Sequence, residues 1–361
     1  MFEFEIDEAI EKASTPPSRF YKDPAVFEET KNSVFARSWQ FIGDAELAKV
    51  PGAVYPLTLL EGCLDEPLVL TRDTNDNLNL VSNVCTHRGN LVVEGAGNER
   101  FLRCRYHGRR FGLDGCFQSM PEFEGVCGFP SEADHLAKVP FGHWGPFLFA
   151  SVNPSVAIET ALKPMMDRVG WLPLDDFRHD PQRSKDYLVR GNWALYVDNF
   201  LEGFHIPFIH ASLNQVIDYD NYTFELYDHL NLQLAGAKSG DDHFDLPLSS
   251  PDHGKDIAAY YYWLFPNTMF NFYPWGLSIN VVKPLAHDLT RVSFICYVWD
   301  ESRLGKGAGA ALDRVEREDE AIIELVQKGV QSRFYDRGRY SPTKERGTHH
   351  FHRLLAAAMR G

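Results

Sequence analysis

The spacing of hydrophobic and polar positions divides the chain into regions of different character. In residues 1–40, apolar positions such as Phe27, Val34 and Phe35 recur at near-helical spacing, which predicts a helical segment. Residues 41–153 carry short β-type runs interrupted by Gly and Pro, and they predict a small all-β domain. Within it we expect a hairpin turn at 75–77 and strands at 67–71, 78–84 and 147–152.

Residues 154–361 are expected to form a second domain that mixes strands and helices. Runs rich in aromatic and β-branched residues predict strands at 187–189, 223–226, 231–234, 268–272, 278–282 and 292–299. The polar segment 236–255 predicts a long loop. Residues 310–328 give the clearest helical pattern, with an inward-facing stripe at Leu312, Val315, Asp319, Ile322 and Val326. The expected fold class is therefore α+β.

Composition and charge narrow the classes of function. The 36 Lys and Arg against 50 Asp and Glu leave a net charge of -14, which excludes a nucleic-acid binder that works by phosphate neutralisation. No apolar run approaches the roughly 18 residues of a membrane span, and no secretory signal is visible, so we expect a cytoplasmic protein. Six Cys are too few and too scattered for a disulfide framework, so the useful question is which of them bind metal.

Two short segments each combine one cysteine with one histidine. Cys85 and His87 are followed, after 16 residues, by Cys104 and His107. Two loop tips of this composition can surround one metal centre with two thiolates and two imidazoles, the ligand set of a Rieske [2Fe-2S] cluster. Because neutral imidazoles put less negative charge on their iron than thiolates do, such a cluster accepts an electron readily.

The glycines that follow both segments agree with a cluster. Gly89 and Gly108 let backbone N–H groups approach and donate to cluster sulfurs. The competing interpretation is a structural zinc site with two Cys and two His. A zinc finger more often pairs Cys with Cys and His with His, whereas each segment here mixes the two. Four unrelated buried residues are the remaining alternative, and the spacing favours the cluster.

A second group of metal-ligand residues lies in an aromatic stretch of the second domain. Asn199, Glu202 and His205 are spaced by three, so a continuous helix would place them on one face. His210 comes five residues after His205, which is not same-face spacing. Pro207 lies between the two histidines and is expected to interrupt the helix, so that both imidazoles converge.

A mononuclear iron site also needs a carboxylate, and the predicted helix at 310–328 supplies Asp319. This residue interrupts the apolar stripe, and a carboxylate aimed at the core is costly unless it is paired or bound to metal. Two His and one carboxylate on one face of the metal are typical of non-haem Fe(II) oxygenases. Glu316, three residues upstream, is the rival for this role, and a surface ion pair is the alternative explanation of Asp319.

These motifs, in this order and at these separations, resemble the oxygenase α subunits of the Rieske non-haem iron oxygenase family over nearly the whole chain. The resemblance implies an all-β Rieske [2Fe-2S] domain at 41–153, inserted near the N-terminus of a helix-grip, START-like catalytic domain at 154–361. Residues 1–40 are then a helical segment that packs on the catalytic domain. The implied ligands of the cluster and of a mononuclear Fe(II) are Cys85, His87, Cys104 and His107, and His205, His210 and Asp319, respectively.

The resemblance also implies partners. Members of the family form head-to-tail homotrimers in which electrons pass from one subunit's cluster to the next subunit's iron, where O2 is activated. The electrons come from a separate NAD(P)H-dependent flavin or iron–sulfur reductase, directly or through a ferredoxin. A carboxylate three residues before the first His ligand bridges the two centres; it is usually Asp, and the matching residue here is Glu202. Glu202 and Asn199 are therefore the expected catalytic residues.

Several features are similar to the branch of the family that acts on quaternary ammonium compounds, such as choline, betaine and carnitine monooxygenases. They are Glu202, the pair Glu318 and Asp319, and the segments 265–276 and 324–329. This implies a small substrate hydroxylated at a methyl or methylene group, with or without loss of formaldehyde, and no nucleic-acid or membrane partner. The aromatics of 265–276 are candidates for cation–π contacts. Arg109 departs from the family, many of whose members have Trp after His-Gly.

Two other functions stay open at this point. The first is an aromatic-ring-hydroxylating dioxygenase that forms cis-dihydrodiols, often with a separate β subunit. The second is not an enzyme but a START-like ligand-binding module that carries a structural zinc.

Overall fold

The computed structural model describes residues 2–310 and 312–361, without the side chains of Asp220 and Asn221, and the chain forms two compact units. One unit joins Met1–Ser38 to Val156–Gly361, and the other consists of Trp39–Ser155. The first 38 residues therefore belong to the same unit as the C-terminal half, although more than a hundred residues separate them in the sequence.

The Trp39–Ser155 unit is built from three small antiparallel sheets. Their strand orders are β1-β10-β9, β4-β3-β2-β5 and β6-β7-β8. The strands predicted at 67–71, 78–84 and 147–152 are confirmed as β3 (Glu66–Arg72), β4 (Leu78–Ser82) and β10 (Phe147–Ala150). The other strands are β1 (Gln40–Asp44), β2 (Ala53–Leu59), β5 (Gly97–Asn98), β6 (Leu102–Arg103), β7 (Arg110–Phe111), β8 (Phe117–Ser119) and β9 (Phe141–Trp144).

The predicted hairpin turn at 75–77 joins β3 to β4. The Asp73 carboxylate accepts hydrogen bonds from the backbone N–H groups of Asn75 and Asn77, at 2.8 and 2.9 Å. Asp76 has a φ of 68°, a left-handed conformation that Asp tolerates better than most residues. The turn chemistry of the sequence thus explains why the chain reverses here.

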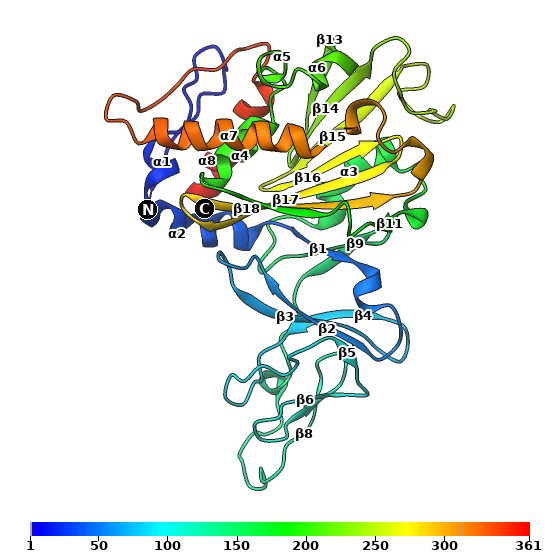
Figure 1. The fold of residues 1–361 in the computed structure, drawn as a ribbon. Helices are drawn as coiled ribbons and strands as arrows, with labels where there is room; N and C mark the ends of the chain where they lie inside the picture. Colours follow the sequence, from blue (N-terminus) through cyan, green and yellow to red (C-terminus); the bar gives the residue numbers. More distant parts are fainter. Residues whose placement is uncertain (1, 311) are drawn as a thin grey trace. The chain divides into compact units, whose positions relative to one another are not determined.

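The other unit contains one eight-stranded antiparallel sheet with the order β11-β18-β17-β16-β15-β14-β13, in which β12 also pairs with β18. Figure 1 shows this sheet with the long helix α7 (Leu312–Val330) running along it. All six predicted strands are present. The bounds of the sheet strands are β11 (Arg178–His179), β12 (Lys185–Val189), β13 (Ile217–Leu226), β14 (Leu230–Ala237), β15 (Ile257–Leu264), β16 (Thr268–Tyr273), β17 (Gly276–Ala286) and β18 (Leu289–Val298).

The sequence patterns did not predict the strand β15. All eight of its residues are buried, so it lacks the alternation of a half-exposed strand. It lies between β14 and β16 near the middle of the sheet, where both of its faces are covered. Its burial shows that the sheet is covered on both faces at this strand.

The helices of this unit pack on the sheet and on one another. α4 (Trp193–Phe200) contacts β17, α7 and α8 (Arg346–Arg360), and α7 also contacts β12. The helix predicted at 310–328 is confirmed as α7, although Ala311 lies outside the described residues. The remaining helices are α1 (Arg19–Lys22), α2 (Pro24–Ser33), α3 (Ile158–Val169), α5 (Ile206–Ile209) and α6 (Leu213–Val216).

The predicted inward stripe of α7 is confirmed in part, since Leu312, Val315 and Asp319 line a cavity of this unit. The fully buried positions of the helix are Glu316, Ile323, Gln327 and Val330, whereas Val326 is exposed. The most deeply buried face is therefore rotated toward the side that carries Glu316, and it includes two polar residues. A stripe defined by apolar residues alone cannot reveal such a face, because Glu316 and Gln327 are polar.

A buried ion pair fixes the predicted loop at 236–255 to α3. The Asp252 side chain is 0% exposed, and its two oxygens accept from Arg168 Nε at 2.5 Å and Nη2 at 2.9 Å. Tyr260 and Lys255 also donate to this carboxylate. The segment is irregular, as predicted, but its end is held by charge-assisted hydrogen bonds.

The helices also bear on the expectation that no segment of the chain spans a membrane. Among the described residues, the helices are either too short or too polar to cross a lipid bilayer.

Arg168→Met should destabilise this unit, because it leaves the buried Asp252 carboxylate without its main counter-charge. We expect the free energy of unfolding to fall by about 3 kcal/mol. Lys163→Met on the same helix is the matched control, because Lys163 pairs with Asp167 in solvent, with 69% and 62% of the two side chains exposed. The control should change stability by no more than about 0.5 kcal/mol. Equal losses in denaturant-induced unfolding would contradict the structural role of Asp252.

Candidate metal centres and substrate cavity

The two Cys–His segments form loops with the same backbone hydrogen bonds. In the first, Cys85 N–H donates to Asn90 O at 2.8 Å and Gly89 N–H donates to Cys85 O at 3.0 Å. In the second, Cys104 N–H donates to Arg109 O at 2.9 Å and Gly108 N–H donates to Cys104 O at 3.0 Å. Gly89 and Gly108 have φ values of 72° and 76°, which glycine adopts without strain. The sequence thus folds two equivalent loops, each of which presents one thiol and one imidazole.

The side chains of these loops fit the ligand set of a Rieske cluster. The ring centroids of His87 and His107 lie 4.7 Å apart, and both cysteines are buried. Burial raises the pKa of the Cys85 thiol, and the Cys104 thiol raises it further. His107 Nδ1 is buried and has no hydrogen-bond partner among the described residues. A ring nitrogen in this state is available as a metal ligand.

Arg109, which departs from the family pattern, is accommodated by aromatic rings. Its guanidinium lies 4.9 Å from the centroid of Phe117 and 5.5 Å from that of Phe129. It also pairs with Asp134 at 2.5 Å, while its own side chain is only 2% exposed. A planar cation stacked on aromatics fills the space of a large aromatic side chain. Arg109 is therefore held beside the second loop by aromatic rings and by Asp134.

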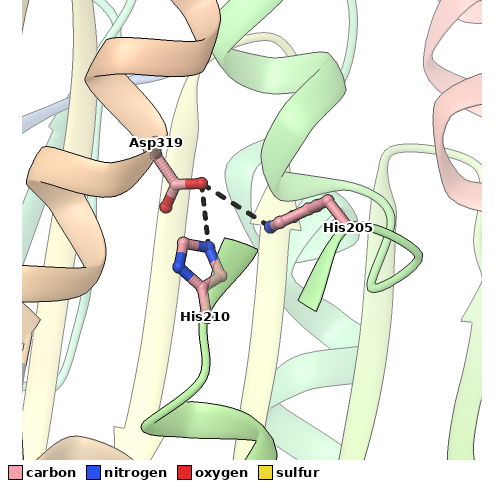
Figure 2. Close-up of side chains that lie close together, drawn as sticks. All are labelled: His205, His210 and Asp319. Carbon is pink, nitrogen blue, oxygen red and sulfur yellow. Dashed lines mark hydrogen bonds and ion pairs between the residues drawn. The ribbon is translucent and has the colours of Figure 1, made fainter. Parts of the chain in front are cut away.

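His205, His210 and Asp319 come together in the other unit. Asp319 reaches from α7, and one of its oxygens, Oδ1, lies 3.0 Å from His210 Nε2 and 3.6 Å from His205 Nε2 (Figure 2). The ligand atoms of the three residues all lie within 4.8 Å of one another. Two imidazoles and one carboxylate in this arrangement are suited to a divalent iron with open coordination positions.

The local structure that brings the histidines together differs from the prediction. α4 ends at Phe200, so of the three residues expected on one helix face only Asn199 is helical. Glu202 and His205 follow in a turn, and Pro207 lies in the first turn of α5 rather than interrupting a helix. Proline is favoured at that position because its missing N–H is not needed there. The chain therefore breaks before Pro207, and this break directs both imidazoles to Asp319.

Hydrogen bonds from outside the triad orient each of its members. His205 Nδ1 is 2.6 Å from Glu202 Oε1, and His210 Nδ1 is 2.8 Å from Glu318 Oε2. Asn199 Nδ2 donates to Asp319 Oδ1 at 2.6 Å. Because both Nδ1 atoms are occupied, both Nε2 atoms face the space between the three residues. Carboxylates that hold histidine ligands in this way also make the imidazoles better donors to a metal.

The electrostatics of the triad reflect the excess of carboxylates. Burial lowers the pKa of His210, but the hydrogen bonds and charges of Asp319 and Glu318 outweigh burial and raise that pKa above its usual value. The hydrogen bond with His210 is also the main cause of the lowered pKa of Glu318. A site that stabilises positive charge this strongly is suited to a metal cation.

Glu316, the rival to Asp319, is engaged elsewhere. Its Oε2 accepts a hydrogen bond of 2.5 Å from the Tyr196 hydroxyl, and it contacts neither histidine through a hydrogen bond. The structure therefore brings Asp319 to the histidines and separates Glu316 from them. Sequence reasoning gave no role to Tyr196 and did not foresee that Glu318 orients His210. The signal for Glu318 is its position beside Asp319, one residue along the same helix.

A cavity of about 110 Å³ opens beside the triad. Its sheet side follows the strand register, in which Gln233 faces Tyr261 and Tyr261 faces Asn271 across neighbouring strands. Of the aromatic segment 265–276, only Asn271 and Tyr273 line the cavity, because alternate residues of β16 point to the other face. Most of the aromatic lining comes instead from other elements, namely Tyr196, Phe200, Tyr222, Tyr261 and Phe294.

Comparison with protein families accounts for both centres. Residues 38–130 match the "Rieske [2Fe-2S] domain", and residues 174–361 match the "Ring hydroxylating alpha subunit (catalytic domain)". These two domains carry a Rieske [2Fe-2S] cluster and a mononuclear iron, as the sequence analysis expected. The predicted fold class, an all-β Rieske domain combined with a mixed catalytic domain, is confirmed as well.

Individual proteins and structures that match over nearly the whole chain point to the same two domains. A chloroplastic choline monooxygenase of Arabidopsis thaliana is 30% identical over 98% of this chain and 85% of that protein. The carnitine monooxygenase oxygenase subunit of Escherichia coli K12 is 29% identical, covering 96% and 94% of the two chains. The structure of a quaternary ammonium Rieske monooxygenase superposes with a TM-score of 0.78 at 23% identity, over 99% and 100% of the chains. A naphthalene 1,2-dioxygenase from Rhodococcus sp. shares the fold at 17% identity, with a TM-score of 0.73 over 96% and 94%.

The chain is thus an oxidoreductase rather than a START-like binding module with a structural zinc, and it belongs to the Rieske non-haem iron oxygenases, the family of ring-hydroxylating α subunits.

Proposed function

We propose that this protein is the terminal oxygenase of a multicomponent system that hydroxylates a small quaternary ammonium compound. The observation that carries the proposal is the convergence of His205, His210 and Asp319 at the wall of a small, aromatic-lined cavity. Its choline and carnitine monooxygenase relatives match almost the whole chain. The cavity is also small compared with the roughly 300–1,000 Å³ of pockets for drug-sized ligands, which favours a compact substrate over a polycyclic aromatic one.

Each centre has a defined set of protein ligands in this proposal. Cys85, His87, Cys104 and His107 hold the [2Fe-2S] cluster, and His205, His210 and Asp319 hold Fe(II). When bound, the cluster supplies one electron at a time and the iron supplies O2 activation beside the substrate. The functional domains follow the same division, with the Rieske domain at 41–153 and the catalytic domain at 154–361.

The residues around the iron ligands hold them in place and connect them to the source of electrons. Glu202 accepts from the backbone N–H groups of Phe204 and His205 as well as bonding His205 Nδ1, so its carboxylate is fixed in one position. We assign it the bridge to the cluster of a neighbouring subunit. Asn199 fixes the Asp319 carboxylate through a hydrogen bond and keeps Oδ1 directed at the two histidines.

The reaction needs partners that lie outside this chain. Insertion of one oxygen atom from O2 consumes two electrons and two protons, which a separate NAD(P)H-dependent reductase provides in this proposal. A bridging role for Glu202 requires a second copy of the chain, and a head-to-tail homotrimer supplies it. We place the system in the cytoplasm, where NAD(P)H is available.

The first test is spectroscopic and analytical. The anaerobically purified protein should be reddish brown, should give a Rieske EPR signal after reduction with dithionite, and should contain about three irons per chain. With a reductase, quaternary amines should stimulate NADH and O2 consumption, and aromatic acids should not. Stimulation by aromatic acids alone would favour the ring-dioxygenase alternative and contradict the proposed substrate class.

Asp319→Ala should empty the mononuclear site selectively. We expect iron content to fall from about three to about two per chain, because the triad loses its only carboxylate, while the cluster absorbance is unchanged. Asp313→Ala is the matched control, since Asp313 lies on the same helix and pairs with Lys185 near the surface. If Glu316→Ala loses iron and Asp319→Ala does not, Glu316 is the iron ligand and the assignment of Asp319 is wrong.

Glu202→Gln should separate electron transfer from iron binding. Glutamine keeps a hydrogen bond to His205 but removes the charge, so iron should be retained while oxidation of the reduced cluster by O2 slows by about 10- to 100-fold. Glu318→Gln makes the same change at His210, outside the bridging position, and should slow this step much less when iron is saturating. The step is followed by stopped-flow absorbance. If both variants slow it equally, Glu202 only orients its histidine.

A further inference from the structure

The cavity beside the triad has an unusual balance of charge. Its lining contains three carboxylates, Glu202, Glu316 and Asp319, and it contains no Lys or Arg. Glu202 and Asp319 already have histidine partners. Among the described residues Glu316 has no cationic partner, so the protein itself supplies nothing to balance a charge on this carboxylate.

One oxygen of the Glu316 carboxylate has a hydrogen-bond partner and the other has none among the described residues. It is 2% exposed, and the Tyr196 hydroxyl donates to its Oε2. Its other oxygen, Oε1, is buried without a hydrogen-bond partner among the described residues. A buried carboxylate oxygen without a partner costs free energy, and a ligand that supplies the partner removes this cost. Because Glu316 lines the cavity, a ligand there can supply the missing partner.

The surroundings of Glu316 disfavour its ionised form while the cavity is empty. Burial raises its pKa well above the usual range, and the charges of Asp319, Glu320 and Asp313 add to the effect against the hydrogen bond from Tyr196. A positive charge in the cavity reverses this balance, because it stabilises the carboxylate. The net charge of the cavity also favours a cationic ligand. A divalent iron offsets two of the three carboxylates, and a monocation offsets the third.

The rest of the lining fits a cation with a neutral polar end. Tyr222, Tyr261 and Tyr273 line the cavity, and aromatic rings attract a quaternary ammonium group. The ring centroids of Tyr261 and Tyr273 lie 5.9 Å apart. Asn271 is buried, lines the cavity, and its Oδ1 has no hydrogen-bond partner among the described residues. An amide oxygen accepts readily from a hydroxyl group. A substrate carboxylate finds no Lys or Arg along this wall.

We infer that Glu316 is the specificity-determining residue of the oxygenase, and that it selects a substrate with net positive charge, such as an amino alcohol, over a zwitterionic betaine. The inference rests on the proposed function and goes beyond it, because it distinguishes among quaternary ammonium compounds by their net charge.

The test compares binding of three probes to the iron-loaded, anaerobic enzyme by isothermal titration calorimetry. Choline is the cation, 3,3-dimethyl-1-butanol is its neutral isostere, and glycine betaine is the zwitterion. The native protein should bind choline at least about tenfold more tightly than either of the others. Glu316→Gln should lose this preference, with choline affinity reduced about tenfold or more and the neutral isostere changed less than about threefold.

Two further variants test whether the effect depends on the charge and on the position of Glu316. Glu316→Asp retains the charge and should retain the preference for choline. Glu320→Gln removes a carboxylate one turn along the same helix that does not line the cavity, and it should leave the preference unchanged. Iron content is measured in every variant, and loss of iron from Glu316→Gln would make Glu316 a metal ligand and overturn the inference.

The outcomes separate the inference from the function on which it rests. If the native protein binds choline and its neutral isostere equally, or if Glu316→Gln keeps the preference, the inference is wrong and the proposed function stands. If the native protein binds none of the quaternary compounds, both fail together.

Discussion

The catalytic unit is organised around a cluster of carboxylates that surrounds two histidines. Glu202, Glu318 and Asp319 converge on two histidines, and Glu316 lies one helical turn away. Arg314 pairs with Glu318, but in the described part of the chain no Lys or Arg lines the cavity. Carboxylates held close together repel one another unless a cation is near. A divalent cation between the two histidines and Asp319 would reduce this repulsion, so the geometry is suited to metal binding.

The arrangement in turn depends on where α4 stops. If the helix continued past Phe200, Glu202 and His205 would lie on one of its faces. His210 would then point in another direction, because positions five residues apart do not share a helix face. The turn after Phe200 instead lets both imidazoles reach α7. Gly203 permits the close approach of this turn to Tyr222, since a Cβ atom there would lie 3.0 Å from the tyrosine ring. One short segment thus shapes both the metal site and the cavity wall.

Features that depend on residues close together in the sequence could be predicted from it, and features that depend on distant contacts could not. The Cys–His loops, the turn after β3 and the helix α7 are encoded locally, by spacing, turn residues and periodicity, and they were found. The buried face of α7 and the strand β15 were not, because both depend on what packs against them from distant parts of the chain. Glu316 illustrates the limit. It was considered only as a ligand, and its pairing with Tyr196, 120 residues earlier, follows from tertiary contacts alone.

A cationic substrate poses a problem that Glu316 solves. A monocation beside a divalent iron is repelled, by an amount on the order of a few kcal/mol at the separations found within one cavity. Aromatic rings offset part of this cost, since they attract a cation by about 0.5–2 kcal/mol. A carboxylate that is buried, fixed by Tyr196 and free at Oε1 can offset the remainder. The ionised form of the same carboxylate is costly when no cation is present, so a cation that enters also stabilises the site that receives it.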